Sequence, residues 1–185
     1  MNLFQTSVVA SELILLELDG IGRFELGMTE FSGIGNCQLI VVKPGGLKKV
    51  VDSYDGLRPY QLRKFDLDSD GSVEIVAILR HPDGTEVLPF IYQTDSEFTR
   101  IHPLPESKDI APLIFNEIVL TTWGDSPVLC GKTAVSFHEF GPPDLFLLEF
   151  FQLKESRLEL FNKDFTEGTH FNILLNRGAL SFSEG

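Results

Sequence analysis

The residues best suited to chemistry form an acidic loop that runs directly into an apolar segment. Oxygen-bearing side chains recur at alternate positions of this loop and are followed by a glycine, a serine and a final acid: Asp66, Asp68, Asp70, Gly71, Ser72 and Glu74. This spacing lets one short loop wrap a hard cation such as Ca²⁺. The four carboxylates and the backbone carbonyl of Ser72 are the predicted ligands, and Gly71 makes the sharp turn. Aspartate and glycine are also common in metal-free turns, so the pattern leaves that alternative open.

The loop does not match the helical calcium site of EF-hand proteins. That site needs a helix on each side and a bidentate glutamate at its twelfth position. Counting from Asp66, the twelfth residue is Ala77, which lies inside the apolar run 75–79. Such a run is typical of a buried strand, so the sequence predicts a loop followed by a strand.

The neighbourhood of this loop is repeated along the chain. Residues 18–26 align with residues 67–75, with leucine, aspartate, glycine, glutamate and an apolar residue at equal offsets. Each copy is followed by a second strand-like segment, at residues 38–42 and 87–92. Both comparisons give a period of about 50 residues, which is the length of a propeller blade or of a similar radial repeat.

A third and more divergent copy follows. Residues 116–120 resemble residues 73–77, and residues 148–152 resemble residues 88–92, with an insertion between the two matched segments. The acidic loop is missing from this copy, where residues 110–115 are apolar instead. The third unit is therefore expected to hold no metal.

Turn signals between the apolar runs indicate hairpins. They lie at residues 81–85, where Pro82, Asp83 and Gly84 adjoin, and more weakly at residues 43–46 and 154–157. We therefore predict an all-β fold: a propeller-like array of about three to four antiparallel blades, with a curled β-sandwich as the alternative.

We expect one β-repeat domain over residues 1–185, with units at roughly 16–53, 65–103 and 115–162. Terminal strands within residues 1–15 and 170–183 are expected to form a fourth, split blade that joins the two ends of the chain. A homo-oligomer in which two chains complete one ring is a further alternative.

The Asp-x-Asp-x-Asp-Gly-x-x-Glu spacing of residues 66–74 resembles the loops of FG-GAP/VCBS-type repeats, which occur in the β-propellers of integrin α-chains. The resemblance is clearest over residues 16–101 and fades in the third unit. It implies a non-catalytic scaffold whose loops recognise a protein or a glycan, with Ca²⁺ stabilising one blade. In the first repeat, Ile21 stands where a carboxylate ligand is needed, so that copy is expected to be a metal-free turn.

Composition limits the classes of partner. The chain has 185 residues, of which 43% are hydrophobic, and this is enough for a substantial core. Fifteen basic residues against 27 acidic ones give a formal charge of −12. A field of that sign repels phosphate backbones and anionic lipid surfaces, so neither nucleic acid nor a membrane is an expected partner.

An enzymatic function is the rival interpretation. His138 lies beside Glu139 and close to Asp144, and a histidine beside carboxylates can act as a base, so a small hydrolase or lyase is one alternative. A metal-free cytosolic assembly or regulatory factor is another. The chain contains no His-Glu-x-x-His or Gly-x-Ser-x-Gly motif, and no complete Gly-x-x-x-x-Gly-Lys-Ser/Thr motif, because Ser126 stands where the first glycine would precede Gly131-Lys132-Thr133.

The compartment is expected to be the cytoplasm. The first residues lack a positively charged region, and Glu12 and Glu17 interrupt the apolar residues 11–18, so neither a signal peptide nor a membrane span is predicted. Removal of a leader would instead indicate an exported protein. Cys37 and Cys130 are expected to be buried, reduced thiols, with a disulfide between them as the alternative.

Overall fold

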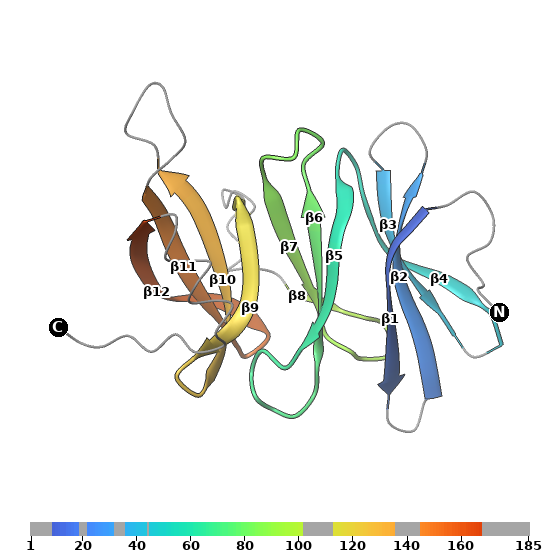
Figure 1. The fold of residues 1–185 in the computed structure, drawn as a ribbon. Coiled ribbons are helices and arrows are strands. Elements are labelled where there is room, and N and C mark those ends of the chain that lie inside the picture. The colour runs from blue at the N-terminus through green and yellow to red at the C-terminus, as the bar shows by residue number, and fades with distance from the viewer. Residues whose placement is uncertain are drawn as a thin grey trace. The chain divides into compact units, whose positions relative to one another are not determined.

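The computed structural model of the chain describes residues 9–18, 22–31, 36–43, 45–101, 113–135 and 145–167. Over these ranges it contains twelve β-strands and no helix, which confirms the all-β fold class (Figure 1). In the same ranges no helix is long and apolar enough to cross a membrane. The strands form three four-stranded antiparallel sheets, and none of the three closes on itself.

Each sheet is built from four strands that are consecutive in the chain. The first sheet contains β1 (Val9–Leu18), β2 (Gly22–Phe31), β3 (Asn36–Val42) and β4 (Lys48–Tyr54). The second contains β5 (Arg58–Phe65), β6 (Glu74–Arg80), β7 (Val87–Tyr92) and β8 (Arg100–Ile101). The third contains β9 (Glu117–Trp123), β10 (Ser126–Val135), β11 (Leu145–Lys154) and β12 (Arg157–Glu167). In every sheet each strand pairs with its neighbours in sequence, so a four-stranded meander occurs three times.

The chain divides into two compact units. One comprises Met1–Lys64 and Glu74–Arg100, and the other comprises Phe65–Val73 and Ile101–Gly185. The first unit thus contains the first sheet and most of the second sheet. The second unit contains the third sheet together with most of the acidic loop that follows β5.

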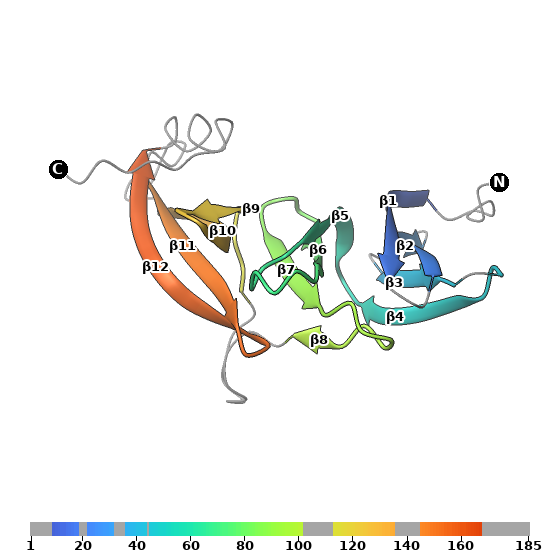
Figure 2. The same ribbon diagram turned by 90° about the horizontal axis from the view of Figure 1, so that it is seen from below.

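In the first unit, the first and second sheets meet through β4 and the segment from β7 to β8 (Figure 2). The rings of Tyr54 and Phe90 pack with their centroids 4.6 Å apart. The hydroxyls of Tyr54 and Tyr92 are hydrogen-bonded to each other, and Tyr92 donates a hydrogen bond of 2.8 Å to Asp52. Burial raises the pKa of both tyrosines, so the phenols stay neutral. This seam combines aromatic packing with a hydrogen-bonded polar network.

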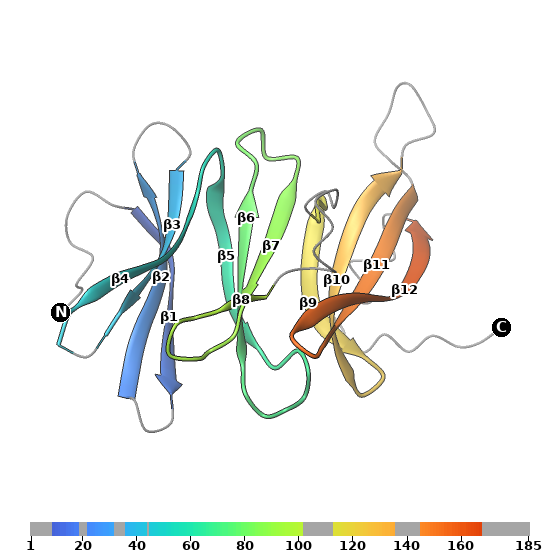
Figure 3. The same ribbon diagram turned by 180° about the vertical axis from the view of Figure 1, so that it is seen from behind.

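In the second unit, β9 to β12 form the third sheet (Figure 3). Consecutive residues of β10 are buried, namely Val128, Leu129 and Cys130, and successive side chains of a strand point to opposite faces, so the sheet carries buried side chains on both faces. One face is a cluster of buried residues that the indole of Trp123 packs against: Val128, Cys130, Leu148 and Phe150. On β10, Gly131 leaves room for the ring of Phe115. A β-carbon at that position would lie 2.2 Å from the Cε1 atom of Phe115, so only glycine permits this close approach.

The three expected hairpins are confirmed. Strands β6 and β7 pair through the turn at residues 81–85, where the amide of Gly84 donates to the carbonyl of His81 at 2.8 Å. Strands β3 and β4 pair through the turn after Lys43. Strands β11 and β12 pair through Glu155 and Ser156, both of which have positive φ angles. Turn residues therefore located the hairpins correctly from sequence.

The predicted alignment of the third copy is wrong by one strand. Residues 116–120 lie mainly in β9, the first strand of its sheet, whereas residues 73–77 lie mainly in β6, a second strand. In the third sheet, the strand that corresponds to β6 by order is β10, which lies between the two matched segments. Strand β10 therefore accounts for part of the apparent insertion. The other matched pair, in β7 and β11, consists of two third strands and is confirmed.

The N-terminal strand also differs from the expectation. Val9–Leu18 was expected to contribute residues to a fourth, split blade, but it is the edge strand of the first sheet and pairs with β2. The other half of that expected blade, residues 170–183, lies outside the described residues. Residues 18–26 and 67–75 nevertheless both lead into the second strand of a sheet, with residues 22–26 in β2 and residues 74–75 in β6.

Candidate metal centre

The acidic loop leaves β5 at Phe65 and enters β6 at Glu74. Its fold is local, because its own aspartates accept its backbone amides. The amide of Gly71 donates to Asp66 Oδ2 at 3.1 Å, that of Asp70 donates to Asp68 Oδ1 at 3.2 Å, and that of Ser72 donates to Asp70 Oδ1 at 2.6 Å. Gly71 has a φ angle of 89°, the left-handed conformation that the sequence assigned to it.

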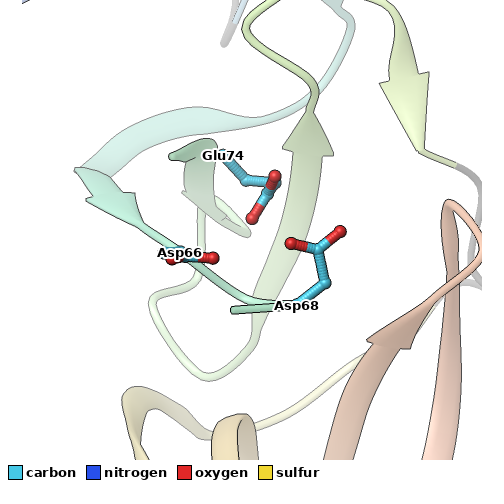
Figure 4. A group of neighbouring side chains, drawn as sticks. All are labelled: Asp66, Asp68 and Glu74. Atoms are coloured by element: carbon cyan, nitrogen blue, oxygen red, sulfur yellow. The ribbon is translucent and has the colours of Figure 1, made fainter. Parts of the chain in front are cut away.

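Three of the predicted ligands come together in this loop. One carboxylate oxygen from each of Asp66, Asp68 and Glu74 lies within 4.8 Å of the other two (Figure 4). Asp70 is not part of this group. Its carboxylate accepts the amide of Ser72 instead, so the loop itself uses the side chain that was expected to bind a metal.

The three carboxylates differ in their surroundings. Glu74 is buried, with 4% of its surface exposed, while Asp68 is exposed and Asp66 is intermediate. The Oδ1 atom of Asp66 is buried and accepts no hydrogen bond from the part of the chain that the structure describes. Burial raises the pKa of Asp68, and the nearby carboxylates of Asp70 and Asp66 raise it further. Three carboxylates of different exposure therefore lie close together in this loop.

This geometry suits a large, oxygen-binding cation. Ca²⁺ binds oxygen ligands at about 2.3–2.6 Å, so two ligands on opposite sides of one ion are about 5 Å apart. The spacing of up to 4.8 Å in this cluster fits that limit. All three ligands are carboxylates, which favours a hard cation over a soft one. Asp66, Asp68 and Glu74 are thus the side chains that could hold Ca²⁺.

A cleft of about 290 Å³ adjoins the loop within the second unit. Three turns form it, namely the acidic loop, the β9–β10 turn and the β11–β12 turn. Its lining residues are Leu67, Asp68, Ser69, Asp125, Ser126, Pro127, Gln152, Leu153 and Lys154. Asp68 belongs both to the cleft and to the carboxylate cluster. No sequence pattern pointed to this cleft, because its residues come from three distant parts of the chain.

The remaining sequence candidates do not add to this site. His138, Glu139 and Asp144 lie outside the described residues. Cys37 and Cys130 are both buried, as expected. Burial raises the pKa of the Cys130 thiol to about 12, and nearby Glu117 raises it too, so this sulfur is a poor nucleophile at neutral pH.

Comparisons with known proteins identified no relative. No protein-family model matches the chain, and neither the curated proteins nor the solved structures gave a match. The resemblance to FG-GAP/VCBS-type repeats therefore stays a prediction made from the loop and the repeat.

Proposed function

We propose that this protein is a non-catalytic scaffold that recognises a protein or glycan partner, and that its acidic loop binds a structural Ca²⁺ ion. The observation that carries the metal assignment is the cluster of Asp66, Asp68 and Glu74. One oxygen of each lies within 4.8 Å of the other two, and one buried oxygen of Asp66 accepts no hydrogen bond from the described residues. An ion between them would place a positive charge among three close carboxylates.

We also propose a propeller-like arrangement of FG-GAP/VCBS-type blades. Support comes from the repeated four-stranded meander and from the place of the acidic loop between the first and second strands of a sheet. In the second sheet this connection is long and acidic, whereas in the third sheet it consists only of Gly124 and Asp125. One blade of the array would then carry the metal.

The ion would act on the structure by joining the two ends of the loop. Asp66 and Asp68 precede the turn at Gly71, and Glu74 begins β6, so one cation bound by all three fixes the loop against the strand. The same loop contributes Leu67, Asp68 and Ser69 to the cleft. Calcium would therefore set the shape of a surface available to a partner.

Calcium titration with thermal unfolding tests the metal assignment. A ligand that binds only the folded state stabilises it by about 2.7 kcal/mol at a hundredfold excess over its dissociation constant. We expect the melting temperature to rise with Ca²⁺, and we expect Asp68→Asn to abolish the rise. The matched control is Asp83→Asn, which removes one exposed carboxylate from the β6–β7 turn and should leave the rise intact. An unchanged melting curve at millimolar Ca²⁺ would refute the metal assignment.

A further inference from the structure

We infer that the cleft of the second unit binds a basic polypeptide segment and takes up one of its arginine side chains. This inference names the partner class for the recognition role proposed above and rests on that role. It does not require the metal, because the cleft is formed by side chains of the chain itself.

The shape of the cleft suits a long side chain with an apolar stem. Leu67 and Leu153 are 1% and 3% exposed, and with Pro127 they give the cleft apolar lining. A volume of about 290 Å³ is small for a ligand pocket and sufficient for one extended side chain. The methylene groups of arginine cover apolar surface of this kind while the charged head stays near water.

The charges around the cleft favour a cationic head group. Asp68 and Asp125 are both exposed and both line the cleft, against one basic residue, Lys154. The loop that bears Asp68 carries further acids at Asp66 and Asp70. A guanidinium group pairs with carboxylates through several parallel hydrogen bonds, so this rim recognises arginine better than a neutral side chain. The formal charge of −12 on the whole chain also attracts a basic partner.

Polar groups beside the carboxylates can fix the peptide backbone. Gln152 lines the cleft next to Leu153, and Ser126 lies next to Asp125. An amide and a hydroxyl each both donate and accept, which suits the alternating groups of an extended peptide. Lys154 lines the same cleft and repels a cation there, so it lowers the affinity for a basic peptide. Its substitution is therefore a way to change that affinity.

The two ligands are expected to compete in part. Asp68 lines the cleft and also belongs to the carboxylate cluster. A calcium ion on Asp68 neutralises part of the negative rim, so Ca²⁺ should weaken binding of the basic peptide by a few-fold. Asp125 is outside the cluster, so it keeps its full contribution in the presence of calcium.

Fluorescence anisotropy with a short labelled arginine peptide tests the inference. The matched probe is the same peptide with citrulline, which has the shape of arginine without its charge. In EDTA we expect the arginine peptide to bind and the citrulline peptide to bind at least tenfold more weakly, since ten-fold corresponds to about 1.4 kcal/mol. Asp125→Asn should weaken the arginine peptide about tenfold, and Lys154→Glu should tighten it several-fold.

Two control variants carry the same charge changes elsewhere. Asp83 lies in the β6–β7 turn and Lys48 lies in β4, both in the first unit. Asp83→Asn and Lys48→Glu should therefore leave the peptide affinity unchanged. Equal effects of the control and cleft variants, or equal binding of the citrulline peptide, would overturn the inference in favour of general electrostatic attraction. Analytical sedimentation measures self-association of the chain. If the parent self-associates and Asp125→Asn abolishes this self-association, the occupant of the cleft is a second copy of the chain and the inference is overturned.

The experiments distinguish an error in the calcium proposal from an error in the peptide-binding inference. Peptide binding in EDTA together with an unchanged melting curve in Ca²⁺ refutes the metal alone. A calcium-dependent rise in melting temperature without any peptide binding refutes the cleft alone.

Discussion

Two loops that follow strands of the second sheet differ in how many hydrogen bonds and how many neighbouring acids surround their aspartates. In the loop between β7 and β8, Asp95 accepts the amides of Glu97 and Thr99, each at 3.0 Å, and the hydroxyl of Thr99 at 2.5 Å. In the loop between β5 and β6, the carboxylates of Asp66 and Asp68 face each other and Glu74. The β7–β8 loop gives its acid three hydrogen bonds, whereas the acidic loop gives Asp66 and Asp68 one backbone amide each and also brings both close to a third carboxylate.

The pKa values follow from this difference. Burial acts to raise the pKa of Asp95, but the hydrogen bonds from Thr99 and Glu97 together lower it below its usual range. Burial and the neighbouring carboxylates raise the pKa of Asp68. An external cation therefore gains little at Asp95 and much at the acidic loop, where it replaces repulsion by attraction. The comparison thus indicates which of two aspartate-rich turns is open to a ligand.

The largest expected effect comes from removing the buried side chain of Phe98, in the loop between β7 and β8. Phe98 is 4% exposed, and its φ angle of 58° is unusual for an aromatic residue. Phe98→Ala should lower the free energy of unfolding by about 3–5 kcal/mol, as for other buried phenylalanines. Urea denaturation measures this loss, with the exposed Ser96→Ala as the matched control. A loss below 1 kcal/mol would show that burial of Phe98 does not hold the loop.

The next effect separates the two aspartates themselves. Asp95→Ala removes three hydrogen bonds from an exposed turn, so we expect it to cost about 1–2 kcal/mol at neutral pH. Asp68→Ala in EDTA removes one hydrogen bond and a repulsion between carboxylates, so we expect no net loss or a small gain. Both variants are compared with the parent by urea denaturation. Equal losses from the two substitutions would contradict the contrast between the loops.

The dependence of stability on pH should differ in sign at the two sites. The pKa of Asp95 is lowered by folding, so the stability it contributes is present above the unfolded-state value of about 3.9 and is lost as the pH falls through the folded-state value. The pKa of Asp68 is raised, so its ionisation costs stability as the pH rises through the raised value.

Denaturation in EDTA at several pH values tests these signs. The deficit of Asp95→Ala should shrink toward low pH. Asp68→Asn should match the parent at low pH and exceed its stability above the raised pKa. A deficit of Asp68→Asn that grows with pH would reverse the sign and remove the case for a cation at this loop.

The acidic loop could be predicted from sequence because its geometry is local. Asp66, Asp68 and Glu74 lie in one short stretch, so their spacing already brings their carboxylates together. The exclusion of Asp70 could not be predicted in this way. Whether its carboxylate points to a cation or to the amide of Ser72 depends on the exact turn, which the residue pattern does not determine.

The sequence was less informative about features that join distant parts of the chain. The third repeat was misaligned because β9 has an apolar pattern like that of β6, and a two-residue connection at Gly124 and Asp125 gives only a short turn signal. The cleft could not be found at all, since it requires the β9–β10 and β11–β12 turns to lie beside the acidic loop. Composition and periodicity describe elements and not their approach to one another.

The smallest effect concerns Ser69 of the acidic loop, which has the same left-handed backbone conformation as Phe98 but differs from it in burial. Ser69 in the acidic loop has a φ angle of 61°, close to that of Phe98, but Ser69 is exposed. The left-handed conformation costs a non-glycine residue about 1–2 kcal/mol, and glycine gives back about 0.5–1 kcal/mol through its greater freedom in the unfolded chain. Ser69→Gly should therefore stabilise the protein by about 0.5 kcal/mol.

The matched control is Ser96→Gly, where φ is not positive and the same substitution should destabilise by a similar amount. Because Ser69 offers no carboxylate, the variant should keep the full calcium response, and a lost response would mean that the loop backbone, rather than the three acids, determines whether the ion binds.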